Sequence, residues 1–134
     1  MSDENKALVR RFYEQMSAGN VDVIDELIAD DLIEHDEFPG LEPSKAGVRK
    51  FFETLRAAFP DLEMIAEDMV AEGDKVFVRA TIRGTHRGEF LGVAATNRRI
   101  TIPIGDYVRF ANGRLVEHWG ITDTGALMEQ LSGG

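Results

Sequence analysis

Two aspartates interrupt strand-like apolar runs, and they are the residues of this sequence best suited to chemistry. Asp106 takes one place in the alternating apolar series of residues 100–110. Asp123 ends a second series, which starts at Leu115 and has Trp119 on the same expected face. An ionised carboxylate among apolar side chains is costly unless it is paired, solvated in a pocket or protonated. Both aspartates are therefore candidates for the polar groups of a small-molecule site.

Three histidines are further candidates for acid–base work or ligand binding. If the covered face defined by residues 76–82 continues, His86 falls on it, and His35 is a second candidate to join the aspartates. His118 points away from the face assigned to Asp123, so we expect a structural role for it. The histidines lack any close metal-ligand spacing and the chain has no cysteine, so no metal site is predicted.

Each candidate also has an ordinary structural explanation. Asp123 directly precedes a helical stretch, and an aspartate N-cap stabilises a helix by about 1 kcal/mol. For Asp123 the helix-cap role and the catalytic role are equally supported by the sequence, and the two are compatible. Asp106 pairs more simply with an arginine such as Arg79 or Arg109. A bulge near His86 would turn it to solvent, and a surface hydrogen bond is the common outcome for His35.

The elements that must hold these residues are helices first and antiparallel strands afterwards. Helices are expected from Ser2 or Asp3 to Gly19, from Val21 to Ile28, from Ser44 to Pro60 and from Thr124 to Leu131, with a brief strand at Leu32–Asp36. From Leu62 the apolar period becomes two, with turns at Gly73-Asp74 and Asn112-Gly113 and a long connection from Gly84 to Arg98 that could overhang a cavity. This order predicts an α+β fold with helices packed on one face of a curved sheet.

The composition limits the choice of partners. The chain has 134 residues, 43% hydrophobic and 29% charged, which suits one folded domain spanning residues 1–134. Its net charge of −9 disfavours nucleic acid and anionic membranes as partners. The acidic start is unlike a signal peptide, and no apolar run approaches the length that spans a bilayer. A cytoplasmic location is the default expectation.

Several spaced motifs resemble the SnoaL-like polyketide cyclases, which share a superfamily with nuclear transport factor 2 and ketosteroid isomerase. The matching segments are Gly113 to Asp123 with Leu127 to Leu131, Glu34-His35-Asp36 with Pro39-Gly40, Phe59 to Leu62, Gly73-Asp74 before Val76, and Gly84 to His86 with Gly88 to Gly92. Together they cover nearly the whole chain.

The resemblance implies a cone-shaped α+β barrel, in which a curved antiparallel sheet wraps round the N-terminal helices and leaves a deep apolar pocket. It also implies that Asp123 is the general acid/base, removing a proton next to a carbonyl so that the enolate closes a ring by intramolecular aldol addition. The residues that we expect to join Asp123 are His35 and His86 as catalytic partners, and Asp106, Trp119, Phe52 and Phe90 as substrate-binding residues.

The leading hypothesis is therefore a cofactor-independent cyclase or isomerase that acts on a hydrophobic, polyketide-like carbonyl compound. A hydrolase or dehydratase of the epoxide-opening type is the second hypothesis, and a non-catalytic binder of a small molecule is the third. No cofactor is expected, because the sequence has no glycine-rich phosphate loop, dinucleotide fingerprint or nucleophile elbow. The resemblance also predicts a homodimer or higher homo-oligomer, formed through the outer sheet face.

Overall fold

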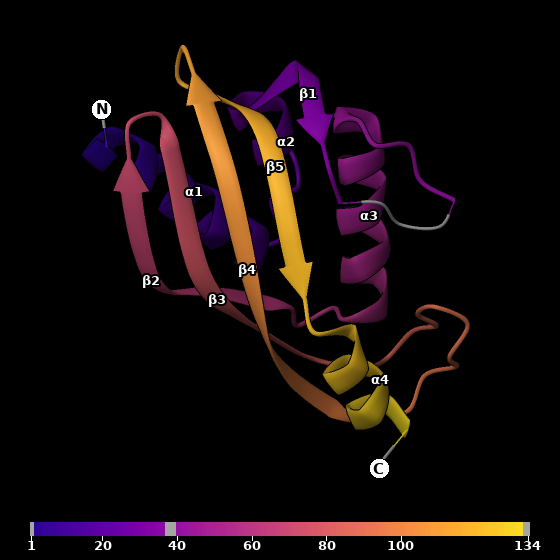
Figure 1. The fold of residues 1–134 in the computed structure, drawn as a ribbon. Helices are drawn as coiled ribbons and strands as arrows, with labels where there is room; N and C mark the ends of the chain where they lie inside the picture. The colour runs from indigo at the N-terminus through magenta and orange to yellow at the C-terminus, as the bar shows by residue number, and fades with distance from the viewer. Residues whose placement is uncertain (1, 37–39, 133–134) are drawn as a thin grey trace.

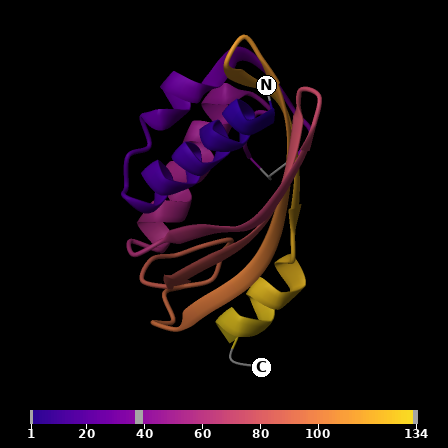
Figure 2. The same ribbon diagram turned by 90° about the vertical axis from the view of Figure 1, so that its left-hand side faces the viewer.

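Five strands form one strongly bent sheet, and helices pack against its concave side (Figures 1 and 2). The computed structural model describes residues 2–36 and 40–132. The helices are α1 (Ser2–Ser17), α2 (Val23–Leu27), α3 (Lys45–Ala58) and α4 (Thr124–Ser132). The strands are β1 (Ile28–Glu34), β2 (Glu63–Glu72), β3 (Lys75–Thr85), β4 (Arg99–Ala111) and β5 (Arg114–Thr122).

The strands follow the order β1-β5-β4-β3-β2, and all neighbours are antiparallel except the pair of β1 and β5. Both predicted hairpin turns are confirmed. Gly73 has a φ of 60°, while Asn112 and Gly113 have φ values of 53° and 76°, the left-handed conformations that a tight hairpin requires. The predicted α+β class, with a curved sheet around N-terminal helices, is confirmed.

The predicted helix boundaries hold except at the short second helix. Ser44 caps α3, because its Oγ accepts a hydrogen bond from the Gly47 amide at 3.3 Å. The helix expected at residues 21–28 is only α2, because Ile28 already has the extended φ and ψ of −100° and 131°. The following strand therefore begins at Ile28 and not at Leu32.

The core lies between the concave face and helices α1 and α3. Val76, Val78 and Ala80 of β3 are at most 1% exposed, and they face the fully buried Met16 and Phe59. The far end of the sheet is closed by α4, where the Gln130 amide bonds the backbone N–H and C=O of Thr101 at 2.7 and 2.9 Å. Among the described residues, no helix is both long and apolar enough to cross a membrane.

A β-bulge in β5 decides which of its side chains face the core. Phe110 pairs with Leu115 and the preceding Arg109 pairs with Glu117, so Val116 is an extra residue opposite this step of β4. The bulge reverses the alternation of β5. Residues 118, 120 and 122 consequently share the concave side with Leu115, and residues 117, 119 and 121 turn to the outer side.

Candidate functional site

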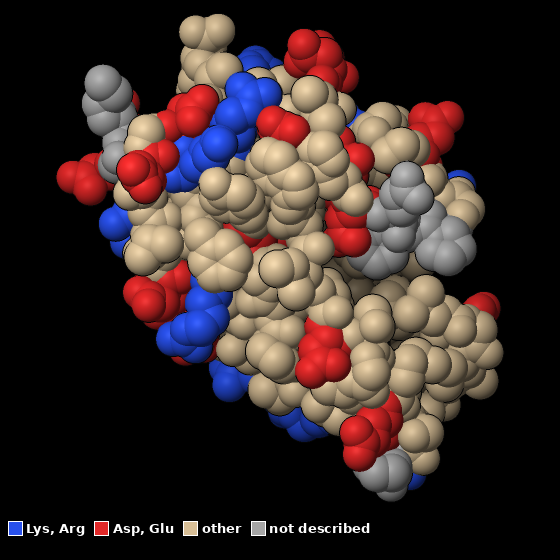
Figure 3. Space-filling view, viewed as in Figure 1, with Lys and Arg blue, Asp and Glu red and all other residues tan. Residues whose placement is uncertain are grey.

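An apolar cavity of about 150 Å³ opens between the concave sheet face and helices α1 and α3. Figure 3 shows the surface hollowed on the right of the molecule. Most of the cavity wall consists of aliphatic and aromatic side chains. Its polar members are Tyr13, Glu34, Asp36, Glu42, Asp106, His118, Thr122 and Thr124. The described part of the wall thus has four carboxylates and one imidazole but neither lysine nor arginine.

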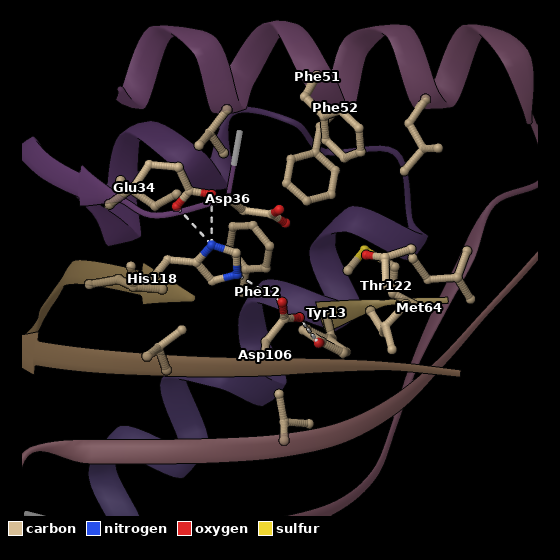
Figure 4. Close-up of a pocket in the computed structure, with 18 of the residues that line it drawn as sticks. Phe12, Tyr13, Glu34, Asp36, Phe51, Phe52, Met64, Asp106, His118 and Thr122 are labelled. Atoms are coloured by element: carbon tan, nitrogen blue, oxygen red, sulfur yellow. Dashed lines mark hydrogen bonds and ion pairs between the residues drawn. The ribbon is translucent and has the colours of Figure 1, made fainter. Parts of the chain in front are cut away.

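Four of these polar residues form one hydrogen-bonded chain along the cavity wall (Figure 4). The Tyr13 hydroxyl of α1 donates to Oδ2 of Asp106 in β4. The other oxygen of that carboxylate, Oδ1, lies 2.8 Å from Nε2 of His118. On the far side of the ring, Nδ1 lies 2.7 Å from both carboxylate oxygens of Glu34. These four side chains come from four elements, α1, β1, β4 and β5.

The imidazole of His118 carries a positive charge at neutral pH. Burial alone would lower the pKa of His118, but its hydrogen bonds to Asp106 and Glu34 and their negative charges outweigh the burial and raise the pKa to about 10. Both ring nitrogens are therefore donors. The Tyr13 phenol also stays protonated, since burial and the nearby charge of Asp106 raise its pKa well above the ordinary value.

Asp36 is a cavity carboxylate that takes no part in the hydrogen-bonded series from Tyr13 to Glu34. Its side chain points into the cavity just past the end of β1 (Figure 4), and it has no hydrogen bond or ion pair with any residue in the described part of the chain. Partial burial raises the pKa of Asp36, the charge of His118 opposes that rise, and the charges of Glu34 and Asp106 add to it. Asp36 is thus a stronger base than an aspartate in water.

Gly120 makes the room that the Asp36 carboxylate occupies. A Cβ atom built on Gly120 would lie 2.3 Å from Oδ2 of Asp36 and 3.0 Å from Cε1 of His118. Gly120 is also the cross-strand partner of Asp106, so both aspartates are its neighbours. Any side chain there would push Asp36 away from the ring of His118.

The expected position of Asp123 is wrong. Asp123 follows the end of β5, where it is exposed and is not among the described residues that line the cavity. Its Oδ1 accepts a hydrogen bond from the Ala126 amide at 2.9 Å and so caps α4. The catalytic role that the family resemblance gives Asp123 stays a prediction.

His35 and Trp119 lie together on the outer side of the sheet, and neither is part of the described cavity wall. Their rings stack with centroids 4.7 Å apart and planes at 6°. Nε2 of His35 lies 2.7 Å from Oε2 of Glu117, which is the surface hydrogen bond that the sequence allowed. The expectation that Trp119 packs in the core or on a pocket wall is wrong, because the bulge at Val116 turns Trp119 to the outer side.

His86 is completely buried but does not line the cavity within the described wall. Its Nδ1 accepts a hydrogen bond from the Thr96 amide at 3.2 Å, and its ring packs against Phe59 with centroids 5.4 Å apart. The alternative in which His86 turns to solvent is therefore wrong. Phe52 and Phe90 do lie on the cavity wall, Phe52 from α3 and Phe90 from the connection between β3 and β4.

Asp106 lies on the concave face, but the pairing with Arg79 or Arg109 weighed for it is wrong, because its two oxygens bond Tyr13 and His118. Arg109 instead bonds Glu117 at 2.9 Å. The sequence reasoning missed Tyr13, Glu34 and Asp36 and assigned His118 to the wrong side. A signal for the two acids was present. Glu34 and Asp36 continue the alternation of the buried Leu32, so they belong to the covered side when His35 does not.

Comparison with known proteins gives the same family that the motifs suggested. The family model of the SnoaL-like polyketide cyclases matches residues 7–131. Comparison with curated proteins found no significant match. Among solved structures, AclR from Streptomyces galilaeus, a proposed hydroxylase, is 28% identical with a TM-score of 0.88 over 100% of this chain and 99% of that one.

Two further structures are similar over almost their whole length. IdmH from Streptomyces antibioticus, a proposed polyketide cyclase, is 32% identical with a TM-score of 0.83 over 96% of this chain and 98% of its own. A proposed SnoaL-like polyketide cyclase from Jannaschia Sp. CCS1 is 26% identical with a TM-score of 0.84 over 99% and 94% of the two chains. With its bent sheet, its apolar cavity and a family match over nearly its full length, this chain belongs to the SnoaL-like polyketide cyclase family.

Proposed function

We propose that this protein is a cofactor-independent cyclase that moves protons next to a carbonyl group of a hydrophobic, polyketide-like small molecule. The observation that carries the proposal is the Asp36 carboxylate, which is free of partners in the described chain and faces the hydrogen-bonded chain from Tyr13 to Glu34 inside an apolar cavity. A base of raised pKa in an apolar pocket is an arrangement suited to proton abstraction from carbon.

Asp36 is the base in this proposal. A carboxylate whose pKa is raised binds a proton more strongly, and positioned acid–base assistance contributes about 10² to 10⁴ in rate. Asp106 is less suited to the task, because both of its oxygens already accept hydrogen bonds from Tyr13 and His118. The Glu34 carboxylate is held by His118 in the same way.

Two hydrogen-bond donors of the cavity wall, Tyr13 and His118, bind the substrate oxygen in this proposal. The Tyr13 hydroxyl and Nε2–H of His118 converge on Asp106 and can turn to a carbonyl oxygen that enters beside it. Asp36 takes the proton from the carbon next to this carbonyl, and the C–H electron pair moves into the enolate. The enolate carbon then attacks a second carbonyl of the same molecule, and this new C–C bond closes the ring. The resulting alkoxide takes the proton back from Asp36.

Hydrogen–deuterium exchange tests the first step without the natural substrate. The methyl protons of 2-acetylnaphthalene are followed by NMR in D₂O at neutral pH with the wild-type protein. The Asp36→Asn variant should exchange them at least about 10²-fold more slowly than the wild-type protein. The matched control is Asp31→Asn, which removes an exposed carboxylate from the adjacent strand β1 and should leave the rate unchanged.

The Asp123→Asn variant distinguishes this assignment from the one that the family resemblance implies. Loss of exchange in Asp123→Asn, together with full exchange in Asp36→Asn, would move the base to Asp123 and overturn our assignment. No exchange by the wild-type protein at saturating ketone would count against enolisation altogether and favour a binding protein.

A water-activating reaction, such as epoxide opening, is the second candidate, because the same Asp36 carboxylate in the cavity could act on a water molecule. In that case Asp36 would take a proton from water and not from carbon. A reaction in water labelled with ¹⁸O separates the two functions, since ring closure brings no solvent oxygen into the product and water addition does.

A further inference from the structure

The connection between β3 and β4 carries a tight turn at its tip with an unusual residue in it. Phe90 and Val93 exchange two backbone hydrogen bonds of 2.9 Å each, which leaves Leu91 and Gly92 as the two turn residues. Their φ values are 52° and 80°. A two-residue turn with positive φ at both positions strongly prefers asparagine, aspartate or glycine at the first one. Leucine at this place is strained.

Nothing within the turn compensates that strain. In the described chain, the other non-glycine residues with positive φ are Asn97 and Asn112, and asparagine tolerates this conformation because its short polar side chain can bond the nearby backbone. The side chain of Leu91 has no polar atom with which to do so. A strained residue persists when its surroundings fix it there, and such residues gather at binding sites.

The surroundings do fix both ends of this connection. At the first end, the backbone N–H groups of Arg87 and Gly88 donate to the carbonyl of Ala58 at 2.9 and 3.2 Å. At the other end, the buried ring of His86 accepts a hydrogen bond from the Thr96 amide. The His86 backbone also accepts from the Asn97 N–H at 2.8 Å and donates to the Arg98 carbonyl at 2.9 Å. The tip of the connection is therefore held by hydrogen bonds at both of its ends.

The side chain at this tip reaches the cavity described above. Leu91 lines the cavity while half of its surface, 51%, is exposed, so it lies where the cavity meets solvent. Its neighbour Phe90 lines the same cavity but is 5% exposed and packs on the ring of Phe59, with centroids 5.5 Å apart. The exposed Glu42 is another wall residue at the opening.

We propose that Leu91 determines the size of the apolar molecules that the cavity admits, and that the strained turn exists to hold this side chain over the opening. The proposal rests on the proposed function only in requiring that a hydrophobic ligand enters this cavity.

Two uncharged fluorescent ketones that differ by one fused ring test the proposal without any catalysis. The probes are 6-propionyl-2-dimethylaminonaphthalene and its three-ring anthracene analogue, and stopped-flow fluorescence gives their association rate constants. In Leu91→Gly and Leu91→Asn the three-ring probe should associate several-fold faster, because the side chain that narrows the opening is removed. The two-ring probe should change less than about twofold, and Leu91→Phe should slow the larger probe.

Thermal unfolding separates this role from ordinary packing. Glycine and asparagine fit the left-handed turn better than leucine, so neither variant should lower the melting temperature. Val93→Ala is the matched control, because it shortens a side chain of the same turn that is not part of the described cavity wall. Equal effects on both probes, no effect on either, or a lower melting temperature with unchanged binding would overturn the proposal. Loss of deuterium exchange alone would contradict the proposed function but not this role of Leu91.

Discussion

The charge on His118 makes a sharp prediction about the pH dependence of stability. The folded protein holds the imidazole between Glu34 and Asp106 with a pKa of about 10, whereas an unfolded histidine titrates near pH 6.5. The perturbation is a rise in pH from neutral to about 9, applied to the wild-type protein and to His118→Gln. The variant keeps a polar side chain in β5 but cannot take up a proton.

The sign follows from which state binds the proton more tightly. Because the folded pKa is the higher one, the stabilisation is fully present below pH 6.5 and is lost as the pH rises through about 10. Between these values unfolding releases one proton, so stability falls by roughly 1.4 kcal/mol per pH unit at the steepest. From pH 7 to pH 9 the His118 contribution should decrease by about 2.5 kcal/mol.

Urea unfolding at a series of pH values measures this contribution. The difference in unfolding free energy between wild type and His118→Gln should shrink by about 2.5 kcal/mol over that range, with unchanged dependence on urea concentration. NMR of the ring nitrogens checks the cause directly, since both should still carry protons at about pH 8. Parallel stability curves, or an imidazole that titrates near pH 6.5, would refute the assigned charge and the reasoning about the carboxylates.

Two further substitutions test the geometry of the site. Asp123→Ala removes the cap of α4 and should destabilise the protein by about 1 kcal/mol in thermal or urea unfolding, with ketone exchange unchanged; a loss of exchange would contradict the exposed position of Asp123. Gly120→Ala should slow deuterium exchange by on the order of 10²-fold with unchanged circular dichroism, because its Cβ would lie 2.3 Å from Asp36 Oδ2 and displace the base. Gly125→Ala is its control, since that Cβ meets only Oδ1 of Asp123 at 3.6 Å; equal rates in both variants would refute the displacement.

Much of the fold follows from local patterns in the sequence. The period-two runs of β3 and β4, the Ser44 cap and the Asn112-Gly113 turn are set by residues close to one another in the chain, so sequence alone predicts them. The same is true of the inward position of Asp106, because β4 alternates from Ile100 to Phe110 without interruption.

The site itself depends on a contact between distant strands. The sequence correctly separated Trp119 from His118, but it assigned the wrong one of the two to the covered side. One extra residue, Val116, reverses the alternation of β5, and a bulge is visible only in the pairing of β5 with β4. Tertiary structure therefore decided that His118 faces inward. Likewise, only the parallel pairing of β1 with β5 brings Glu34 to His118, since a register between strands is not written in either strand alone.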